Sequence, residues 1–341
     1  MTQNKQESLL VVNDLKTHFF TQEGVVKAVD GVSLSLDAGK TLGVVGESGC
    51  GKSVTALSIL RIVERPGRIV SGEVLLRVPQ GNNQEKILDL TKLHDDSMQM
   101  RQIRGGVIAL IFQEPMTSFS PVHTIGDQMI ETILIHLGGT KLEARKRAIE
   151  MLRMVGISRP ESRIDEYAHQ LSGGLRQRAM IATALSCGPR ILIADEPTTA
   201  LDVTTQAQIL DLIRQLQQQT GMSLMLITHN LGVIAEMADD VAVMYLGRVV
   251  EKGPVDDIFH RPKHPYTRAL LRSIPSISSV PRAELPTITG SIPHPYNRPR
   301  GCPFHPRCPR RIRGVCEAAE PALTSITEGH DVSCFLYQAP R

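Results

Sequence analysis

One loop has the residue types and the spacing that bind phosphate. Gly46-Glu-Ser-Gly-Cys-Gly-Lys-Ser53 fits the pattern G-x-x-x-x-G-K-[ST], between an apolar strand pattern and a helical pattern. Its glycines let backbone N–H groups turn inward around phosphate oxygens at the positive end of a helix. We expect Lys52 to reach β- and γ-phosphates and the Ser53 hydroxyl to bind Mg²⁺. The expected nucleotide-binding residues are Gly46, Glu47, Ser48, Gly49, Cys50, Gly51, Lys52, Ser53 and Val54.

A second segment supplies two carboxylates. The apolar run Ile191–Ala194 predicts a buried strand that ends in Asp195 and Glu196. At that strand end Asp195 can hold Mg²⁺ through water, while Glu196 can polarise an attacking water. Hydrolysis needs both tasks, and one carboxylate cannot perform both. The alternative interpretation is a strand that ends in a solvated acidic pair.

A third segment places a hydroxyl and two glycines before a helix. Leu171-Ser-Gly-Gly-Leu-Arg-Gln-Arg178 begins 24 residues before Asp195 and leads into the helical pattern Leu175–Leu185. A hydroxyl and free N–H groups at a helix N-terminus can receive a γ-phosphate. Alone, Ser-Gly-Gly would indicate only a helix cap and a turn. Together with the two preceding segments, it resembles the signature sequence of the ATP-binding cassette (ABC) ATPases.

The resemblance implies an ATP site shared by two cassettes. In that family the signature serves the nucleotide bound to the other cassette, so a dimer with ATP at its seam is implied. Asp202, in Ala200-Leu-Asp202, matches the D-loop, which crosses the seam. The implied signature contacts are Leu171, Ser172, Gly173, Gly174 and Gln177.

Two further family elements, the Q-loop and the switch histidine, lie within residues 8–255, which the resemblance covers. Gln113 matches the Q-loop, whose glutamine would contact Mg²⁺ and the attacking water. The implied Mg²⁺ ligands are Ser53, Gln113 and Asp195. His229 matches the switch histidine, which would bind the γ-phosphate and orient Glu196. Asn230 stands where many relatives carry Asp. The implied catalytic residues are Glu196, His229 and Gln113.

An aromatic side chain is expected beneath the adenine ring. Phe19 falls where the family places that aromatic, with Phe20 adjacent to it. The resemblance thus adds an adenine contact to the nucleotide-binding residues.

Composition excludes several other classes of protein. The 341 residues carry a net charge of only +3, with no Trp and 4% aromatic residues, so no nucleic-acid partner is expected. The N-terminus lacks a basic-then-apolar leader, and no run approaches the roughly 18 apolar residues of a membrane span. We therefore expect a location in the cytosol, where disulfides are rare.

The elements that must position these residues alternate between strand and helix. This alternation predicts an α/β fold with a largely parallel sheet. Expected helices cover residues 53–63, 125–155, 175–185 and 205–219, and the polar residues 79–100 are expected to form a surface excursion. The resemblance implies an ABC-type P-loop cassette with a RecA-like core sheet, an N-terminal antiparallel β subdomain and a helical subdomain.

The amino-acid composition of the chain changes after about residue 253. Residues 260–309 hold 11 of the 21 prolines, which disfavours long regular elements there. We expect an ABC ATPase domain over residues 8–255 and a Pro/Cys-rich C-terminal extension over residues 256–341.

Segments of the C-terminal extension, and two segments of the cassette, indicate which group of ABC proteins the chain resembles. His264-Pro-Tyr-Thr-Arg-Ala-Leu-Leu271 and Gly301-Cys-Pro-Phe-His-Pro-Arg-Cys-Pro309 are similar to segments of the peptide/nickel importer family, as are Phe112-Gln-Glu-Pro-Met-Thr-Ser118 and Thr198–Val203. This implies an ATP-binding subunit of a bacterial importer of di- or oligopeptides, peripheral on the cytoplasmic face of the inner membrane. Implied partners are a second homologous ATPase subunit, two permeases and an extracytoplasmic substrate-binding protein.

Other cargoes and one other class stay open. The same family carries nickel, opines, glutathione and some oligosaccharides, and residues that face ATP cannot separate these. A soluble ABC ATPase without a membrane partner is the alternative class, although such proteins usually carry two cassettes or long coiled-coil insertions.

Four cysteines near the C-terminus form a separate candidate site. Their spacing, C-x5-C-x7-C-x17-C, is neither a C-x2-C zinc pattern nor a standard ferredoxin run. The resemblance implies a [4Fe-4S] cluster, with zinc (and His305 as a possible ligand) or free thiols as alternatives. The implied ligands are Cys302, Cys308, Cys316 and Cys334.

Overall fold

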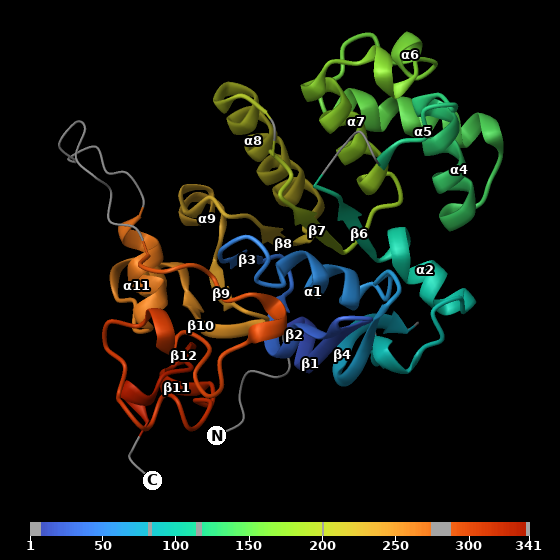
Figure 1. Ribbon diagram of the computed structural model, residues 1–341. Helices are drawn as coiled ribbons and strands as arrows, with labels where there is room; N and C mark the ends of the chain where they lie inside the picture. The colour runs from blue at the N-terminus through green and yellow to red at the C-terminus, as the bar shows by residue number, and fades with distance from the viewer. Residues whose placement is uncertain (1–7, 81–83, 114–117, 200, 274–287, 339–341) are drawn as a thin grey trace. The chain divides into compact units, whose positions relative to one another are not determined.

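The computed structural model describes residues 8–80, 84–113, 118–199, 201–273 and 288–338. The chain divides into two compact units (Figure 1). Unit 1 comprises residues 1–36, 41–91 and 227–341, and unit 2 comprises residues 37–40 and 92–226. The domain boundary that we expect between residues 255 and 256 falls inside unit 1. The division into an ATPase domain and a C-terminal extension stays a prediction.

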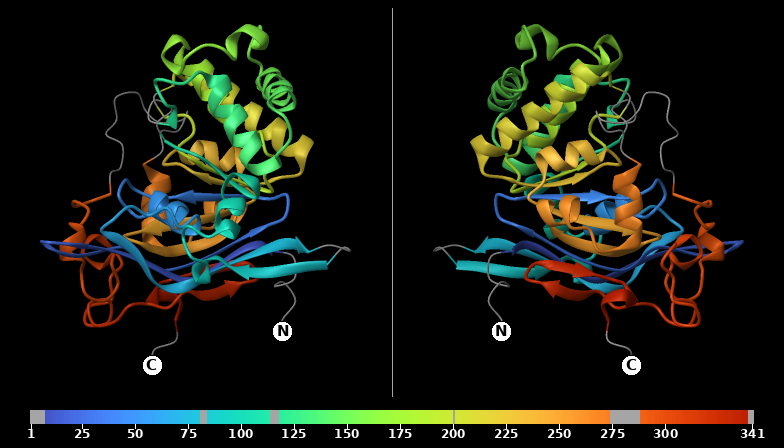
Figure 2. Two further views of the ribbon diagram at one scale, coloured as in Figure 1. Left: turned by 90° about the vertical axis from the view of Figure 1, so that its right-hand side faces the viewer. Right: turned by 90° about the vertical axis from the view of Figure 1, so that its left-hand side faces the viewer.

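Unit 1 contains an antiparallel sheet in the order β2-β1-β4-β5. Figure 2 shows its long strands, in blue and cyan, from two sides. The expected surface excursion contains an edge strand instead, in which Leu88 pairs with Leu76 of the neighbouring strand. The strands are β1 (Ser8–Thr21), β2 (Gly24–Asp37), β4 (Gly67–Gln80) and β5 (Gln84–Asp89).

Unit 1 also contains the strands that carry the phosphate loop. They run in the order β11-β12-β10-β9-β3, with β3 and β9 parallel and the other pairs antiparallel. Strand β3 is buried throughout, as expected of an apolar run between covered faces. The strands are β3 (Thr41–Val45), β9 (Asp240–Tyr245), β10 (Arg248–Pro254), β11 (Thr324–Thr327) and β12 (His330–Val332).

Short helices complete unit 1. The first begins at the end of the phosphate loop, and α9 packs on β3. As the prolines predict, no helix described after residue 260 exceeds the eight residues of α11. The helices are α1 (Lys52–Ile59), α9 (Leu231–Met237), α10 (Val255–His260) and α11 (Pro265–Arg272).

Unit 2 combines strands in the order β8-β7-β6 with a group of helices (Figure 1). Strands β6 and β7 are parallel, as the alternation of elements predicts. The strands are β6 (Ile108–Ile111), β7 (Ile191–Asp195) and β8 (Ser223–Ile227). The helices are α2 (Met98–Gly106), α4 (Ile125–Leu137), α5 (Lys141–Met154), α6 (Pro160–Arg163), α7 (Gly173–Leu185) and α8 (Val203–Thr220).

Candidate nucleotide site and its two halves

Glycine is required at two positions of the phosphate loop because other backbone lies against them. A Cβ on Gly46 would lie 2.2 Å from the carbonyl oxygen of Met244. A Cβ on Gly51 would lie 2.2 Å from the carbonyl oxygen of Ala28, and Gly51 also has a φ of +102°. The neighbouring strands thus hold the loop in a shape that only glycine allows.

The loop's lysine is held against its backbone. Lys52 is 6% exposed, and its Nζ donates to the carbonyl oxygens of Gly46 at 2.9 Å and Glu47 at 3.2 Å. Burial raises the pKa of the Cys50 thiol, so this thiol is a neutral packing group. The arrangement places one ammonium group inside a loop of backbone amides, which suits an anionic ligand.

Two phenylalanines of β1 have different surroundings. Phe19 is half-buried, and it is the residue that we expect beneath adenine. Phe20 is exposed, and the Arg68 guanidinium lies 4.1 Å from the centre of its ring. The adenine contact of Phe19 stays a prediction.

The histidine that we predict to be the switch histidine lies just before a helix of unit 1. His229 is exposed, and Asn230 caps α9 by accepting hydrogen bonds from the N–H groups of Gly232 and Val233. Because Asn and Asp cap helices equally well, Asn230 can cap α9 as an Asp would.

In unit 2 the structure brings two predicted catalytic side chains together. The Nε2 atom of Gln113 donates to Oε2 of Glu196 at 3.3 Å, and the Thr199 hydroxyl donates to the same oxygen at 2.9 Å. Glu196 has a φ of +47°, which a non-glycine residue adopts only at a cost of about 1–3 kcal/mol. Asp195, the preceding residue, is buried at the end of β7. Asp195 is thus buried, whereas the Glu196 carboxylate is held by Gln113 and Thr199. The division of tasks between the two carboxylates stays a prediction.

The signature residues begin α7 in the expected way. The Oγ atom of Ser172 accepts the N–H of Leu175, which caps the helix. A Cβ on Gly174 would lie 3.0 Å from Cγ2 of Thr205 on α8, so this glycine permits close helix packing. Gln177 is 2% exposed and donates from Nε2 to the carbonyl oxygen of Pro197. This hydrogen bond connects α7 to the segment that follows Glu196. The contact of Gln177 with ATP stays a prediction.

The D-loop aspartate has a structural partner. Asp202 caps α8 by accepting the N–H of Thr205 at 3.0 Å, and the Thr205 hydroxyl donates to its other oxygen. These hydrogen bonds lower the pKa of Asp202. Its predicted place at a dimer seam is untested. Residues 114–117 and 200, which belong to the Q-loop and D-loop matches, lie outside the described residues.

The predicted magnesium ligands belong to both units. Ser53 is in unit 1, whereas Gln113 and Asp195 are in unit 2. The magnesium site that these three residues would form, and the role of every residue predicted to bind ATP, remain predictions.

The four C-terminal cysteines are free thiols, of which Cys302 and Cys316 are buried and Cys308 and Cys334 are partly exposed. Burial, and then the nearby thiols of Cys316, Cys334 and Cys308, raise the pKa of Cys302 to about 12. Within the described ranges, no three His, Cys, Asp or Glu side chains are arranged to hold a metal ion. Thiolates suit iron and zinc as ligands, and both the cluster and zinc stay predictions.

Sequence reasoning missed contacts between the C-terminal region and the phosphate loop. The side chains of Arg307 and Tyr266 both bond to Glu47. Both lie in segments that resemble the importer family, but a pairing across more than 200 positions has no local sequence signal.

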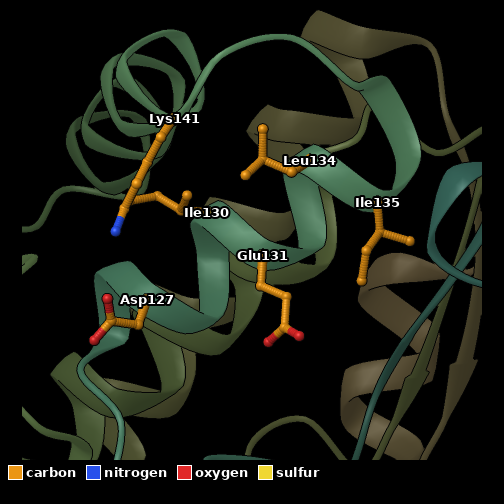
Figure 3. A pocket seen from close by; sticks show the side chains of 6 residues that line it. All are labelled: Asp127, Ile130, Glu131, Leu134, Ile135 and Lys141. Carbon is orange, nitrogen blue, oxygen red and sulfur yellow. The ribbon is translucent and has the colours of Figure 1, made fainter.

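Unit 2 also has a hollow of about 410 Å³ beside α4 (Figure 3). Ile135, on its rim, is 68% exposed. The lining residues are Asp127, Ile130, Glu131, Leu134, Ile135 and Lys141.

None of the helices in the described ranges has the length and apolar character needed to span a bilayer.

The sequence matches two described families. The ABC transporter family matches residues 29–199, and the family described as oligopeptide/dipeptide transporter, C-terminal region, matches residues 250–316. The oligopeptide transport ATP-binding protein AppD of Bacillus subtilis is 50% identical over 97% of each chain. The dipeptide transport ATP-binding protein DppD of Escherichia coli is 46% identical over 96% of each chain.

Solved structures agree with the fold. The dimeric cassette MJ0796, a bacterial ABC transporter cassette, has 27% identity and a TM-score of 0.61, and the match covers 72% of this chain and 98% of that one. MJ0796 bound to ADP and phosphate after hydrolysis matches with a TM-score of 0.62, the same identity and the same coverage. The predicted ABC cassette fold is therefore confirmed. The chain belongs to the ABC transporter family of ATPases, and it carries the C-terminal region of the oligopeptide/dipeptide transporters.

Proposed function

We propose that this chain is the ATP-binding subunit of a bacterial importer, in which ATP hydrolysis drives uptake of di- or oligopeptides. The observation that carries the proposal is the C-terminal region at residues 250–316, which accompanies the cassette. Relatives of 46–51% identity, matched over nearly their whole length, bear peptide transport names, which supports the choice of cargo.

The residues divide the work of hydrolysis as follows. Lys52 and the loop amides bind the phosphates, and Ser53, Gln113 and Asp195 would hold Mg²⁺. When bound, this ion would supply positive charge against the charge that develops on the phosphates during transfer. Glu196 accepts the proton of the attacking water, and Gln113 orients this carboxylate through the 3.3 Å hydrogen bond.

The remaining predicted residues bind the nucleotide from other sides. His229 meets the γ-phosphate, and Phe19 stacks beneath adenine. Ser172, at the N-terminus of α7, meets the γ-phosphate of the nucleotide bound to a second cassette, and Asp202 lies at the seam between the two. In this scheme residues 8–255 form the ATPase domain, and residues 256–341 form the extension.

The partners follow from an importer assembly. We assign this chain a second, homologous ATPase subunit as a heterodimer partner, two permeases and an extracytoplasmic substrate-binding protein. Its place is then peripheral, on the cytoplasmic face of the inner membrane. The cluster implied for the four cysteines is a separate part of the proposal. Its support is that two of them lie side by side, since the backbone N–H of Cys302 donates to the carbonyl oxygen of Cys316 at 2.8 Å.

We assign the hollow beside α4 to a cytoplasmic segment of a permease. The exposed apolar side chain of Ile135 suits an apolar segment, and Asp127 and Glu131 favour basic residues on it. The variant Ile135→Asp should reduce uptake in cells that express the whole transporter, and leave ATP binding intact. Ile87→Asp, on exposed β5 of unit 1, is the matched control. Normal uptake by Ile135→Asp would contradict the assignment.

Uptake in a deletion strain tests the function and the cargo together. Cells lacking this gene receive the wild type, Lys52→Ala or the exposed control Lys146→Ala. Labelled dipeptide, longer peptide, oligosaccharide, opine, glutathione and Ni²⁺ are then compared. We expect peptide uptake to require the wild type or the control. Uptake of another cargo alone would select one of the alternatives, and no dependence for any cargo would favour a soluble ABC ATPase.

A further inference from the structure

The C-terminal region binds the phosphate loop of its own chain. The Arg307 guanidinium donates two hydrogen bonds to the Glu47 carboxylate, at 2.8 and 3.0 Å. The Tyr266 hydroxyl accepts the backbone N–H of Glu47 at 2.9 Å. All three residues belong to unit 1. Both the carboxylate and the amide of this loop residue are therefore engaged by side chains more than 200 positions away.

Buried packing holds these two side chains in place. Arg307 is 8% exposed, and Tyr266 is fully buried. The Tyr266 ring centre lies 4.7 Å from that of Tyr245 and 5.4 Å from that of Phe304. Arg307 also donates from Nε to the carbonyl oxygen of Thr289 at 3.2 Å. Several hydrogen bonds thus hold the guanidinium in place. Water could take over its hydrogen bonds to Glu47 only if the surrounding side chains moved.

The ion pair removes a negative charge from a loop that must receive anions. Without a partner, the Glu47 carboxylate would repel the phosphates of a nucleotide in this loop. A guanidinium stays protonated in proteins, and two hydrogen bonds hold that of Arg307 against the Glu47 carboxylate. Arg307 therefore remains a cation, and it compensates the carboxylate at every physiological pH.

We propose that Arg307 is a positioning residue of the ATPase, which sets nucleotide affinity by neutralising Glu47, while Tyr266 fixes the backbone of the loop. The inference rests on the proposed binding of ATP at this loop. It gives the C-terminal region a part in nucleotide binding, which it exerts through Glu47.

A double-variant cycle in the full chain tests the charge argument. We expect Arg307→Ala to raise the Kd for Mg-ATP about tenfold, within the roughly 5- to 150-fold range of typical coupling between sites. Adding Glu47→Gln to Arg307→Ala should recover most of the affinity, because the repelling charge is gone. A purely structural role of Arg307 would instead make the double variant as weak as the single one. Arg310→Ala, at an exposed position three residues away, is the matched control.

Further measurements keep the test decisive if Arg307→Ala unfolds. Arg307→Lys keeps the charge and loses the two-pronged geometry, so its Kd should lie between those of the wild type and Arg307→Ala. For both variants KM should rise while kcat changes little, and the defect should shrink in high salt. Tyr266→Phe should also raise KM, whereas Tyr337→Phe, which removes a hydroxyl elsewhere in the same region, should not.

Two results would overturn the inference and leave the proposed function standing. One is wild-type affinity in both Arg307 variants, and the other is a double variant no better than Arg307→Ala. Failure of the wild type itself to bind Mg-ATP, or equal binding by wild type and Lys52→Ala, would instead overturn the proposed nucleotide site.

Discussion

The side-chain amide of Gln113 donates a hydrogen bond to the carboxylate of Glu196, with 3.3 Å between Nε2 and Oε2. The carboxylate sits on a residue with a left-handed backbone, directly after the buried strand β7. The Thr199 hydroxyl holds the same oxygen. Three independent constraints thus fix one carboxylate, and this supports its proposed role as the base in hydrolysis.

Replacing that base should separate binding from hydrolysis. Glu196→Gln keeps the shape of the side chain and removes its proton acceptor. We expect ATP binding to persist and kcat to fall by about 10²–10⁴-fold, the usual contribution of a general base. ATP should also accumulate in a closed dimer, detectable by size-exclusion chromatography. Asp211→Asn, which removes an exposed carboxylate of α8, is the control. Wild-type turnover by Glu196→Gln would assign the base elsewhere.

The phosphate-loop lysine should be needed for binding itself. Lys52→Ala removes the cation that the loop holds against the carbonyl oxygens of Gly46 and Glu47. Because phosphate charge then lacks its partner, we expect weaker ATP binding and no transport. Binding of a fluorescent ATP analogue and peptide uptake measure the two effects. Full hydrolysis by Lys52→Ala would be incompatible with the phosphate-site assignment.

The signature serine should act on a different nucleotide from the lysine. In Ser172→Arg a bulky side chain fills the proposed γ-phosphate receptor at the start of α7. We expect nearly normal ATP affinity in the isolated subunit and no ATP-dependent dimer. Equilibrium binding and light scattering report the two properties separately. An equal loss of affinity in the monomer would argue against a site shared between cassettes.

Local motifs were predictable from sequence because each residue's task depends on close neighbours. The loop from Gly46 to Ser53 carries its turn, its lysine and its helix start within eight positions. Helix α8, expected over 205–219, spans Val203–Thr220, because a capping Asp202 and Gly221 flank its apolar pattern. Such features need little information from the rest of the fold.

Other features depended on tertiary pairing and were missed. Strand β5 is polar and lies at a sheet edge, so it lacks the apolar alternation that marks a strand, and its pairing with β4 defines it. The Glu47–Arg307 pair joins positions 260 residues apart. The cysteine spacing suggested a metal site, yet spacing alone does not orient thiols, and no metal-holding group occurs in the described chain.

Elemental analysis should decide what the four thiols hold. The family resemblance predicts iron and sulfide in protein purified anaerobically, in a ratio near that of a four-iron cluster. Cys308→Ser should lose that iron, whereas Cys187→Ser, a buried thiol of unit 2, should keep it. Zinc in place of iron would contradict the cluster but keep the idea of a cross-link. Four thiols that react freely with an alkylating agent would contradict both.

A buried histidine should make the C-terminal region sensitive to acid. His264 caps α11 by accepting the N–H of Tyr266 at Nδ1, and burial lowers its pKa from 6.5 to about 3. The Glu251 carboxylate, which also bonds to His330, accepts the backbone N–H of His264. The neutral form of His264 is thus built into the fold.

The direction of the pH effect follows from this lowered pKa. The unfolded chain binds a proton at His264 below about pH 6.5, and the folded chain does so only near pH 3. The contribution of this neutral histidine to stability is therefore complete above pH 6.5 and is lost as the pH falls. Between pH 7 and pH 5 the loss should be about 2 kcal/mol. His264→Asn keeps a capping oxygen and removes the titration, so its urea midpoint should fall less than that of the wild type over this range. His260→Asn, at an exposed histidine, should behave as the wild type, and an identical pH dependence in His264→Asn would show that another group is responsible.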